Sequence, residues 1–169
     1  MDHSSSNAGF SNSSSARMSV ARTWLAAFNT WDLPTLHGTI TEAQDFRYGV
    51  LPASVGMAPK SRSEWCVYSA TVSRLLPDFK IKILDIHDTS EPGPVVAHIE
   101  TKGTPRTGAQ FSMECIMFIY MRSEKGALKL HKVDEFADTR YVDVYFSAER
   151  ERRKVDGSRK DAKVGRSKL

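Results

Sequence analysis

Apolar residues follow helical spacing in the first half of this chain and strand spacing in the second half, and this order limits the folds that the chain can adopt. Up to Leu76 the large apolar residues recur every three or four positions, whereas from Phe79 onward many of them alternate with polar residues. Early helices followed by consecutive strands are typical of α+β domains, in which helices cover one face of an antiparallel sheet. The pattern therefore predicts two helices, one strand, a third helix and then four strands that form a strongly bent sheet.

Three helices are predicted from their caps and from the apolar stripe along one face. Ser19 could cap the first helix, and Asp32 caps a short second helix that carries Pro34 in its first turn. Ser61 and Glu64 have the spacing of a capping box at the start of the third helix. The stripes of the first and third helices are Val20, Trp24, Leu25 and Phe28, and Trp65, Tyr68, Val72, Leu75 and Leu76.

Five strands are predicted, and the last four are consecutive. The segment from Phe111 to Met121 is apolar on both of its faces, which suits a central strand. A turn over residues 123–126 leads the chain into the last strand. The predicted strands are 45–52, 79–83, 95–101, 111–121 and 127–136.

Both ends of the chain are poor in large apolar residues, which limits the packed domain to residues 18–148. Residues 1–17 contain seven Ser, so we expect a disordered leader there. Residues 149–169 are expected to form a basic flexible tail. Between Ser147 and Leu169 nine basic residues occur with four acidic ones, whereas the whole chain has a net charge of +4, so the domain itself is near neutral. A near-neutral domain offers no broad phosphate-binding face, and we expect no nucleic-acid partner.

Several classes of protein are excluded by motifs that the sequence lacks. No window approaches the roughly 18 uninterrupted apolar residues of a membrane-spanning helix, and the first residues have no signal-peptide pattern, so no membrane partner is expected. The absence of GxGxxG, P-loop and GxSxG motifs disfavours nicotinamide, ATP and covalent hydrolase chemistry. Cys66 and Cys115 form no CxxC pair and the five His form no close cluster, so we expect reduced thiols, no metal and no organic cofactor.

The order of elements and four segments of the chain resemble the nuclear transport factor 2-like cone fold, and more narrowly the SnoaL-like cyclases and isomerases. The four segments are WLAAFNTWD (24–32), DFRY (45–48), TG (107–108) and LHKVDEFAD (130–138). The resemblance spans about residues 18–146 and includes small fungal enzymes of meroterpenoid and alkaloid biosynthesis. It implies N-terminal helices packed on a curved antiparallel sheet, an apolar pocket, and a homodimer formed through the sheet. Many bacterial members carry Trp in the last strand where this chain has Asp134 and Glu135.

In such a fold, function depends on the ionisable groups that point into the pocket, and the alternation of side chains along each strand nominates them. Glu135 is expected to be the general base; Asp134 would then point to the opposite face. An apolar pocket would raise the carboxyl pKa of Glu135 toward neutrality. Glu114 interrupts an apolar stripe of the central strand and could also move protons. The alternative for Glu114 is that it reaches solvent or pairs with a basic residue.

Two more strands supply candidates for polar groups in the pocket. Arg47 could hold a carbonyl, enolate or carboxylate with two donors, and Tyr48 could help to stabilise developing negative charge. The alternative for Arg47 is a structural salt bridge, for example to Glu114 or Glu135. His98 shares a strand face with a carboxylate and could assist proton transfer, although an isolated strand His is more often structural.

The terminal tripeptide Ser167-Lys168-Leu169 matches the peroxisomal import signal, which is read at the extreme C-terminus. The alternative is a chance match at the end of a basic tail. We therefore expect the protein to lie in the peroxisome and to bind the peroxisomal import receptor.

Taken with the resemblance, these features favour an enzyme without a cofactor that isomerises or cyclises a hydrophobic polyketide- or terpenoid-derived intermediate of fungal secondary metabolism. Two alternatives stay open. The chain could be a non-catalytic member of the same fold that binds a small ligand or a protein, which a pocket without titratable groups would favour. It could also be a scytalone-type dehydratase, which needs a His paired with a carboxylate across the pocket.

Overall fold

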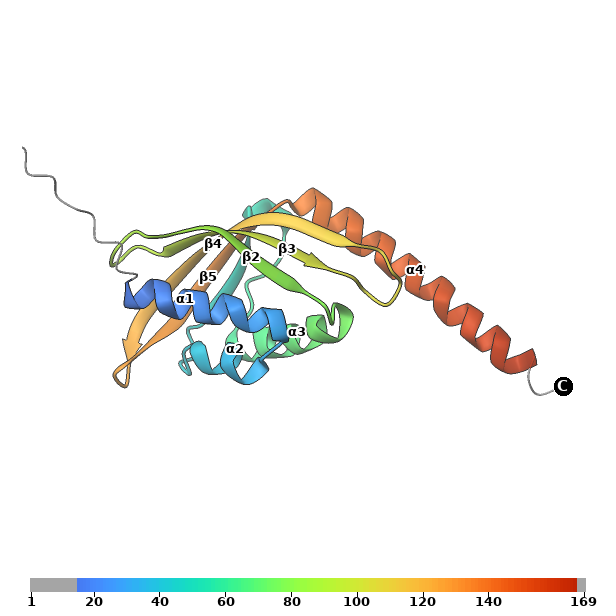
Figure 1. Ribbon diagram of the computed structural model, residues 1–169, viewed down its shortest axis with the longest axis horizontal. Coiled ribbons are helices and arrows are strands. Elements are labelled where there is room, and N and C mark those ends of the chain that lie inside the picture. Colours follow the sequence, from blue (N-terminus) through green and yellow to red (C-terminus); the bar gives the residue numbers. More distant parts are fainter. Residues whose placement is uncertain (1–14, 167–169) are drawn as a thin grey trace, which may run out of the picture.

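The computed structural model describes residues 15–166, in which helices cover the concave side of a single five-stranded sheet (Figure 1). Two short 3-10 helices, η1 (Phe28–Thr30) and η2 (Ala53–Val55), connect larger elements. In chain order the other elements are α1 (Ala16–Ala27), α2 (Leu33–Thr39), β1 (Arg47–Leu51), α3 (Arg62–Leu75), β2 (Lys80–Asp88), β3 (Val95–Gly103), β4 (Phe111–Glu124), β5 (Ala127–Ala137) and α4 (Thr139–Arg166).

The strands lie side by side in the order β1-β5-β4-β3-β2. Strands β2 to β5 form the expected antiparallel meander, and the turn between β4 and β5 uses Lys125 and Gly126, both with positive φ angles, as a two-residue hairpin requires. Strand β1 pairs with β5 in parallel, with Tyr48 opposite Val133. The α+β class and the curved sheet under N-terminal helices are confirmed, but the expectation of a wholly antiparallel sheet is wrong. Parallel neighbours need a long crossover, and here the crossover is α3 with the first three strands of the meander.

The predicted caps of the second and third helices are confirmed. The side chain of Asp32 accepts a hydrogen bond from the backbone N–H of Thr35 at 3.1 Å. The capping box at the start of α3 is complete, because the side chains of Ser61 and Glu64 each accept a hydrogen bond from the backbone N–H of the other. Helix α3 ends at Leu75, close to the predicted residue. Its orientation matters for function because α3 faces the sheet across the cavity described below.

Helix α1 begins earlier than expected, at Ala16, and its cap is Ser15 and not Ser19. A tertiary contact explains the difference: Arg17 is almost fully buried and its guanidinium lies 2.9 Å from the carboxylate of Asp88 at the end of β2. Ser15 also donates a hydrogen bond to Asp88. This pairing is not visible in the local sequence, and the remainder of the expected leader, residues 1–14, lies outside the described residues.

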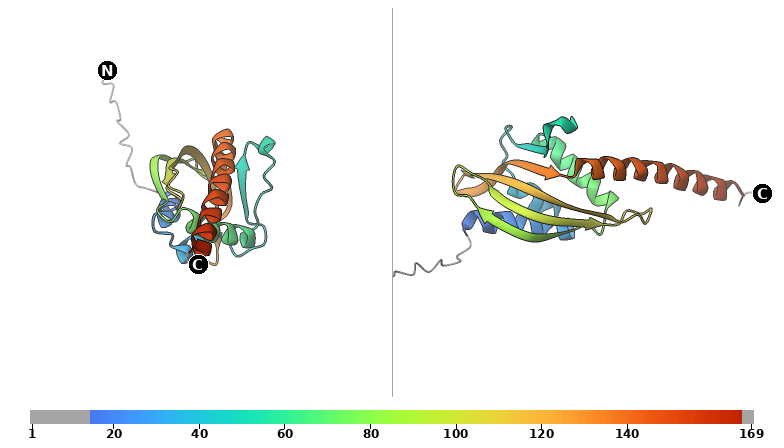
Figure 2. Two further views of the ribbon diagram at one scale, coloured as in Figure 1. Left: turned by 90° about the vertical axis from the view of Figure 1, so that its right-hand side faces the viewer. Right: turned by 90° about the horizontal axis from the view of Figure 1, so that it is seen from above.

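The chain continues as helix α4 to Arg166, where a flexible tail was expected from residue 149 (Figures 1 and 2). Glu149 is only 2% exposed, and its carboxylate accepts hydrogen bonds from Thr107 at 2.7 Å and from Arg152 and Arg153 at 3.0 and 3.1 Å. Burial works to raise the pKa of Glu149, but these three donors outweigh it and hold the pKa below its ordinary value. Charge pairs three and four residues apart support a helix that has few apolar residues. The tripeptide 167–169 lies outside the described residues.

The core lies between the helices and the concave face of the sheet. Trp24, Leu36 and Trp65 from the helices and Phe46, just before β1, are each 1% exposed or less, and they pack with buried side chains of β3, β4 and β5. The first two turns of α4 add a second aromatic cluster, in which the rings of Phe111 and Tyr145 lie 5.1 Å apart. Within residues 15–166 no helix combines the length and apolar character needed to cross a bilayer.

Candidate active site

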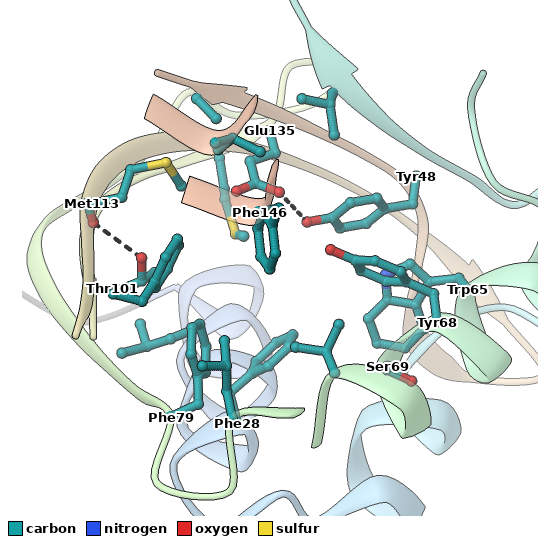
Figure 3. A pocket seen from close by; sticks show the side chains of 18 of the residues that line it. Phe28, Tyr48, Trp65, Tyr68, Ser69, Phe79, Thr101, Met113, Glu135 and Phe146 are labelled. Carbon is teal, nitrogen blue, oxygen red and sulfur yellow. Dashed lines mark hydrogen bonds between the residues drawn. The ribbon is translucent and has the colours of Figure 1, made fainter. Parts of the chain in front are cut away.

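A cavity of about 110 Å³ lies between the concave face of the sheet and helix α3, several times the space that one water molecule needs. Its wall is mostly aromatic and aliphatic, and α4 closes one side with Val142 and Phe146. Figure 3 shows aromatic rings on both sides of the open space. Among the described residues that line the cavity, Glu135 is the only one with a charged side chain. The aromatic residues of the wall are Phe28, Trp31, Tyr48, Trp65, Tyr68, Phe79, Phe111 and Phe146.

Glu135 points from β5 into this cavity (Figure 3). Its strand neighbours Val133 and Ala137 are buried on the same concave face, whereas Asp134 lies on the opposite face and pairs with Lys132. The alternation along β5 therefore places Glu135 as predicted. Burial raises the pKa of Glu135 above its ordinary value, although the hydroxyl of Tyr48 and the thiol of Cys115 favour the charged form. A carboxylate held this way is a better proton acceptor than one in water.

Tyr48 donates a hydrogen bond from its hydroxyl to the carboxylate of Glu135. It is 6% exposed, its ring lies 5.9 Å from that of Trp65, and its backbone is paired with Lys60 by two hydrogen bonds of 2.8 and 3.0 Å. Burial and the adjacent carboxylate of Glu135 raise the pKa of Tyr48, so the phenol stays protonated and remains a donor. The structure thus brings together two of the predicted site residues.

Tyr68 is a polar group of the cavity that sequence reasoning missed. Its position on the apolar stripe of α3 suggested only a packing role, and the sequence contains no further signal for it. In the structure its hydroxyl points toward the same space as the hydroxyl of Tyr48 and the carboxylate of Glu135 (Figure 3). The ammonium group of Lys60 lies 4.7 Å from the centre of the Tyr68 ring, which is a cation–π contact.

Arg47 does not reach the cavity, so the prediction that it stabilises negative charge there is wrong. Its side chain is exposed, and its guanidinium donates hydrogen bonds to the backbone carbonyls of Gln44 and Phe46, at 3.3 and 2.9 Å. Arg47 and Tyr48 are neighbours on one strand and therefore point to opposite faces of the sheet. Since Tyr48 faces the cavity, Arg47 must face outward. The alternative salt bridges of Arg47 to Glu114 or Glu135 are not formed either.

His98 and Glu114 also lie outside the cavity, on the convex face of the sheet. They do contact each other: Nε2 of His98 lies 3.1 Å from the carboxylate of Glu114, and both side chains are substantially exposed, at 43% and 64%. Along β4 every second residue from Phe111 to Met121 is buried, including Met113 and Cys115, so Glu114 belongs to the outward set. The predictions that Glu114 and His98 move protons in the pocket are therefore corrected.

Among the side chains that the structure describes, those of residues 15–155, no three His, Cys, Asp or Glu residues are grouped so that they could bind a metal ion. Cys66 and Cys115 are both free thiols, as predicted. What the cavity offers chemically is one carboxylate of raised pKa, two phenol hydroxyls and a large apolar surface.

Comparison with known proteins identifies the fold. No family model matches the chain, and no curated protein sequence matches it. The BvnE pinacolase from Penicillium brevicompactum superposes with a TM-score of 0.66 at 22% identity, over 82% of this chain and 94% of BvnE. IdmH from Streptomyces antibioticus, for which polyketide cyclisation has been suggested, superposes with a TM-score of 0.57 at 23% identity, over 73% of this chain and 93% of IdmH.

A third solved structure is described by its fold. A protein from Catenulispora acidiphila with a ketosteroid isomerase-like fold superposes with a TM-score of 0.55 at 13% identity, over 69% of this chain and 83% of that protein. The chain therefore has the nuclear transport factor 2-like cone fold that its sequence resembles. At these identities the likeness describes the fold, and the reaction has to be argued from the site.

Proposed function

We propose that this protein is a cofactor-independent isomerase or cyclase that acts on a neutral, hydrophobic small molecule by general acid–base catalysis. The observation that carries the proposal is a single carboxylate, Glu135, enclosed in an aromatic cavity and held by the hydroxyl of Tyr48. Burying a carboxylate costs free energy, and binding an apolar ligand does not require a buried carboxylate. Buried titratable groups of this kind concentrate at sites of proton transfer.

The chemistry assigned to the site is a proton transfer from one position of the substrate to another, with Glu135 as the carrier. The carboxylate removes a proton from the bound substrate, the substrate rearranges or closes a ring, and Glu135 returns the proton at another position. Tyr48 keeps its own proton and orients the carboxylate. The aromatic wall excludes water, which strengthens the electrostatic interactions inside the cavity. No cofactor takes part in this scheme.

The class of substrate is proposed from the lining of the cavity and from the structural neighbours. The wall offers mainly apolar contacts, and among its described residues none is basic, so a neutral molecule with several carbon rings or chains suits it better than an anion. BvnE is a pinacolase from a fungus and IdmH has been linked to polyketide cyclisation. These neighbours support a polyketide- or terpenoid-derived intermediate of fungal secondary metabolism as the substrate.

The two alternative functions have less support. A scytalone-type dehydratase needs a His opposite a carboxylate in the pocket, and His98 lies on the convex face of the sheet with Glu114. A pocket without titratable groups would favour a non-catalytic binding module, and this cavity contains Glu135. An enzyme of the isomerase or cyclase class therefore remains the better proposal.

The proposed function is tested by comparing metabolites of the source organism with and without this gene. The accumulated compound is then incubated in D₂O with the purified protein and with the Glu135→Gln variant. Conversion by the wild type to a product of equal mass, apart from deuterium gained at the new C–H position, supports an isomerase or cyclase. A product one water lighter would support the dehydratase, and an unchanged metabolite profile would support the binding module.

A homodimer formed through the convex face of the sheet is part of the proposal. On this face Phe136 and Ile116 are directly opposite each other in β5 and β4, and they are 50% and 37% exposed. They line a shallow hollow together with His98 and Glu114. A second copy would cover these exposed apolar side chains.

We expect Phe136→Glu to convert the dimer to a monomer, because it places an unpaired carboxylate within the buried interface. Analytical ultracentrifugation measures the change. The matched control is Val67→Glu, since Val67 is 69% exposed on α3, away from the sheet, and should leave the mass unchanged. A wild-type protein that sediments as a monomer at micromolar concentration would contradict the dimer.

Localisation in the peroxisome, with the import receptor as partner, is also proposed, on the basis of Ser167-Lys168-Leu169. A fluorescent protein fused to residue 1 is expected to colocalise with a peroxisomal marker. Removal of residues 167–169 should move the fluorescence to the cytosol, because the receptor reads the exposed terminal tripeptide. The same distribution for both fusions would contradict an import signal.

A further inference from the structure

We propose that helix α4 limits the size of the molecule that the cavity accepts: Phe146 is the residue that determines specificity, and Glu149 is the positioning residue that holds Phe146 in place. The inference deepens the proposed function and rests on it. It adds that the substrate places about one ring, or the end of a chain, beside Glu135, while its remaining atoms lie toward the exposed rim of the cavity.

Two side chains of α4 form part of the cavity wall. Val142 and Phe146 are four residues apart, so they lie on the same face of the helix, and both line the cavity. Figure 3 shows the ring of Phe146 reaching into the space that the other aromatic residues surround. Neither side chain has a polar group, so neither can hold or move a proton. Their contribution to the site is to occupy space.

A second face of α4 is fixed to the start of β4 and to the segment that leads into it. Three hydrogen bonds make this contact, and on the helix they are spaced four residues apart. They run from the backbone N–H of Ser112 to the hydroxyl of Tyr141 at 3.0 Å, from the hydroxyl of Tyr145 to the carbonyl of Ala109 at 2.8 Å, and from the hydroxyl of Thr107 to the carboxylate of Glu149 at 2.7 Å. Because the three bonds follow one face of the helix, they fix its rotation about its own axis and keep Phe146 turned toward the cavity.

Glu149 secures the far end of this contact. Its side chain is 3% exposed, and a carboxylate buried so deeply is stable only when it is paired. Two of its partners, Arg152 and Arg153, lie on α4 itself, so Thr107 is the partner that ties the carboxylate to the rest of the domain. Both arginine side chains are partly exposed, at 38% and 42%. Removing the carboxylate therefore releases this part of α4 without leaving a buried, unpaired cation.

The volume of the cavity indicates how much of a substrate can enter. With Phe146 in place the volume is about 110 Å³. An enclosed apolar cavity of about 150 Å³ binds benzene, so there is room here for about one ring. Met57 and Tyr68 line the cavity and are exposed, which makes them its rim, and further rings of a substrate lie toward them. Replacing Phe146 by Ala removes a six-membered ring from the wall, so a second ring can enter.

The experiment compares toluene and naphthalene, two neutral apolar probes that differ by one ring. Equilibrium dialysis measures the Kd of each probe, and the ratio of the two affinities reports the size limit. Phe146→Ala is expected to raise the affinity for naphthalene relative to toluene by about 10-fold or more, because apolar pockets separate ligands that differ by a single methylene group by at least about that factor. Phe146→Leu, which shortens the side chain less, should give a smaller rise and keeps the test available if the Ala variant does not fold.

The matched control is Val144→Ala on the same helix. Val144 is 62% exposed and does not line the cavity, so this variant should keep the wild-type ratio. An unchanged ratio in both Phe146 variants would overturn the size limit. An equal rise in Val144→Ala would also overturn it, because the effect would then come from a general loosening of α4.

The positioning role of Glu149 is tested by a double-mutant cycle. Glu149→Ala should raise the naphthalene-to-toluene ratio as Phe146→Ala does, because the released helix moves Phe146 out of the wall. Glu149→Gln keeps an oxygen that accepts from Thr107 and should restore most of the wild-type ratio. Added to Phe146→Ala, Glu149→Ala should change the ratio no further. A residue with a structural role alone would lower the melting temperature and leave the ratio unchanged, and that result, or effects that add in the double variant, would overturn the positioning role.

Binding and turnover separate this inference from the proposed function. A ratio that rises as expected, together with no conversion in the metabolite experiment, would overturn the acid–base function while the size limit stands. An unchanged ratio, together with conversion that depends on Glu135, would overturn the size limit alone. Failure of the wild type to bind toluene would also overturn the size limit, because a molecule of one ring must fit the cavity as proposed.

Discussion

Replacing Glu135 by Gln is expected to lower turnover about 10²- to 10⁴-fold, the usual contribution of a general base. Gln occupies nearly the same volume and can still accept the hydrogen bond from Tyr48, so the fold should be preserved. The measurement is kcat/KM for the natural substrate. The matched control is Glu114→Gln on the convex face, which should turn over substrate like the wild type. Wild-type turnover by Glu135→Gln would remove Glu135 as the base.

Turnover and stability of the wild type should depend on pH in opposite directions, and Glu135→Gln should lack both dependences. Because the pKa of Glu135 is raised in the folded protein, the carboxylate is ionised only above that raised value, and wild-type turnover should fall as pH falls through it. Stability has the opposite dependence: Glu135 favours the folded state below the pKa it has in the unfolded chain, and this contribution is lost as pH rises through the folded pKa. Glu135→Gln should therefore unfold at higher temperature than the wild type near pH 7. The difference should shrink in acid.

A circular-dichroism melting series across pH checks this expectation. Equal melting temperatures of the two proteins at every pH would show that ionisation of Glu135 has no cost to folding. The pKa of Glu135 would then not be raised in the folded protein, and the general-base role would lose this support.

Replacing Trp65 by Ala is expected to destabilise the fold by about 3–5 kcal/mol. Trp65 is 1% exposed, and its ring lies 5.8 Å from Trp24 and 6.2 Å from Phe46. Because the residue also borders an existing cavity, truncation joins two empty spaces that the surrounding core cannot close. The buried indole N–H has no partner, and losing it offsets part of this cost, which places the expected value toward the lower end of the range.

Urea unfolding of the variant and the wild type measures the difference. The control is Val67→Ala on the same helix, which removes an exposed side chain and should change stability by about 0.5 kcal/mol or less. A loss below about 1 kcal/mol for Trp65→Ala would show that the cavity wall is not part of the core.

The inward position of Glu135 and the outward position of Arg47 both follow from the alternation of side chains along a strand. Alternation along β5 requires Glu135 and Asp134 to face opposite sides, and the structure places Glu135 inside with the buried residues Val133 and Ala137. Strand β1 is only five residues long and is an edge strand, so its apolar pattern does not indicate which of its two faces points into the core. Strand alternation already requires Arg47 and Tyr48 to face opposite ways, and placing both in the pocket was inconsistent with it.

Glu114 and Tyr68 show a different limit. Strand β4 is apolar on both faces, and so its pattern is compatible with either face being inside. Only the pairing of β4 with β3 and β5, under helices on one side, puts Glu114 outside. Tyr68 lies on an apolar stripe that predicted a helix correctly, but a stripe gives no information about whether a phenol hydroxyl ends in packed core or in open cavity.

Features that depend on neighbours within a few residues can be predicted from the sequence: the caps at Asp32 and Ser61, the helical and strand periodicities, and hence the order of elements and the fold class. Features that depend on residues far apart in the chain are visible only in the folded protein. The fold placed β1 parallel to β5 and so brought Tyr48 to Glu135, and it left the hydroxyl of Tyr68 unpaired in the cavity. Hydrogen bonds within a turn of helix are set by local geometry. A site assembled from two strands and a helix exists only after the sheet has formed and packed against the helices.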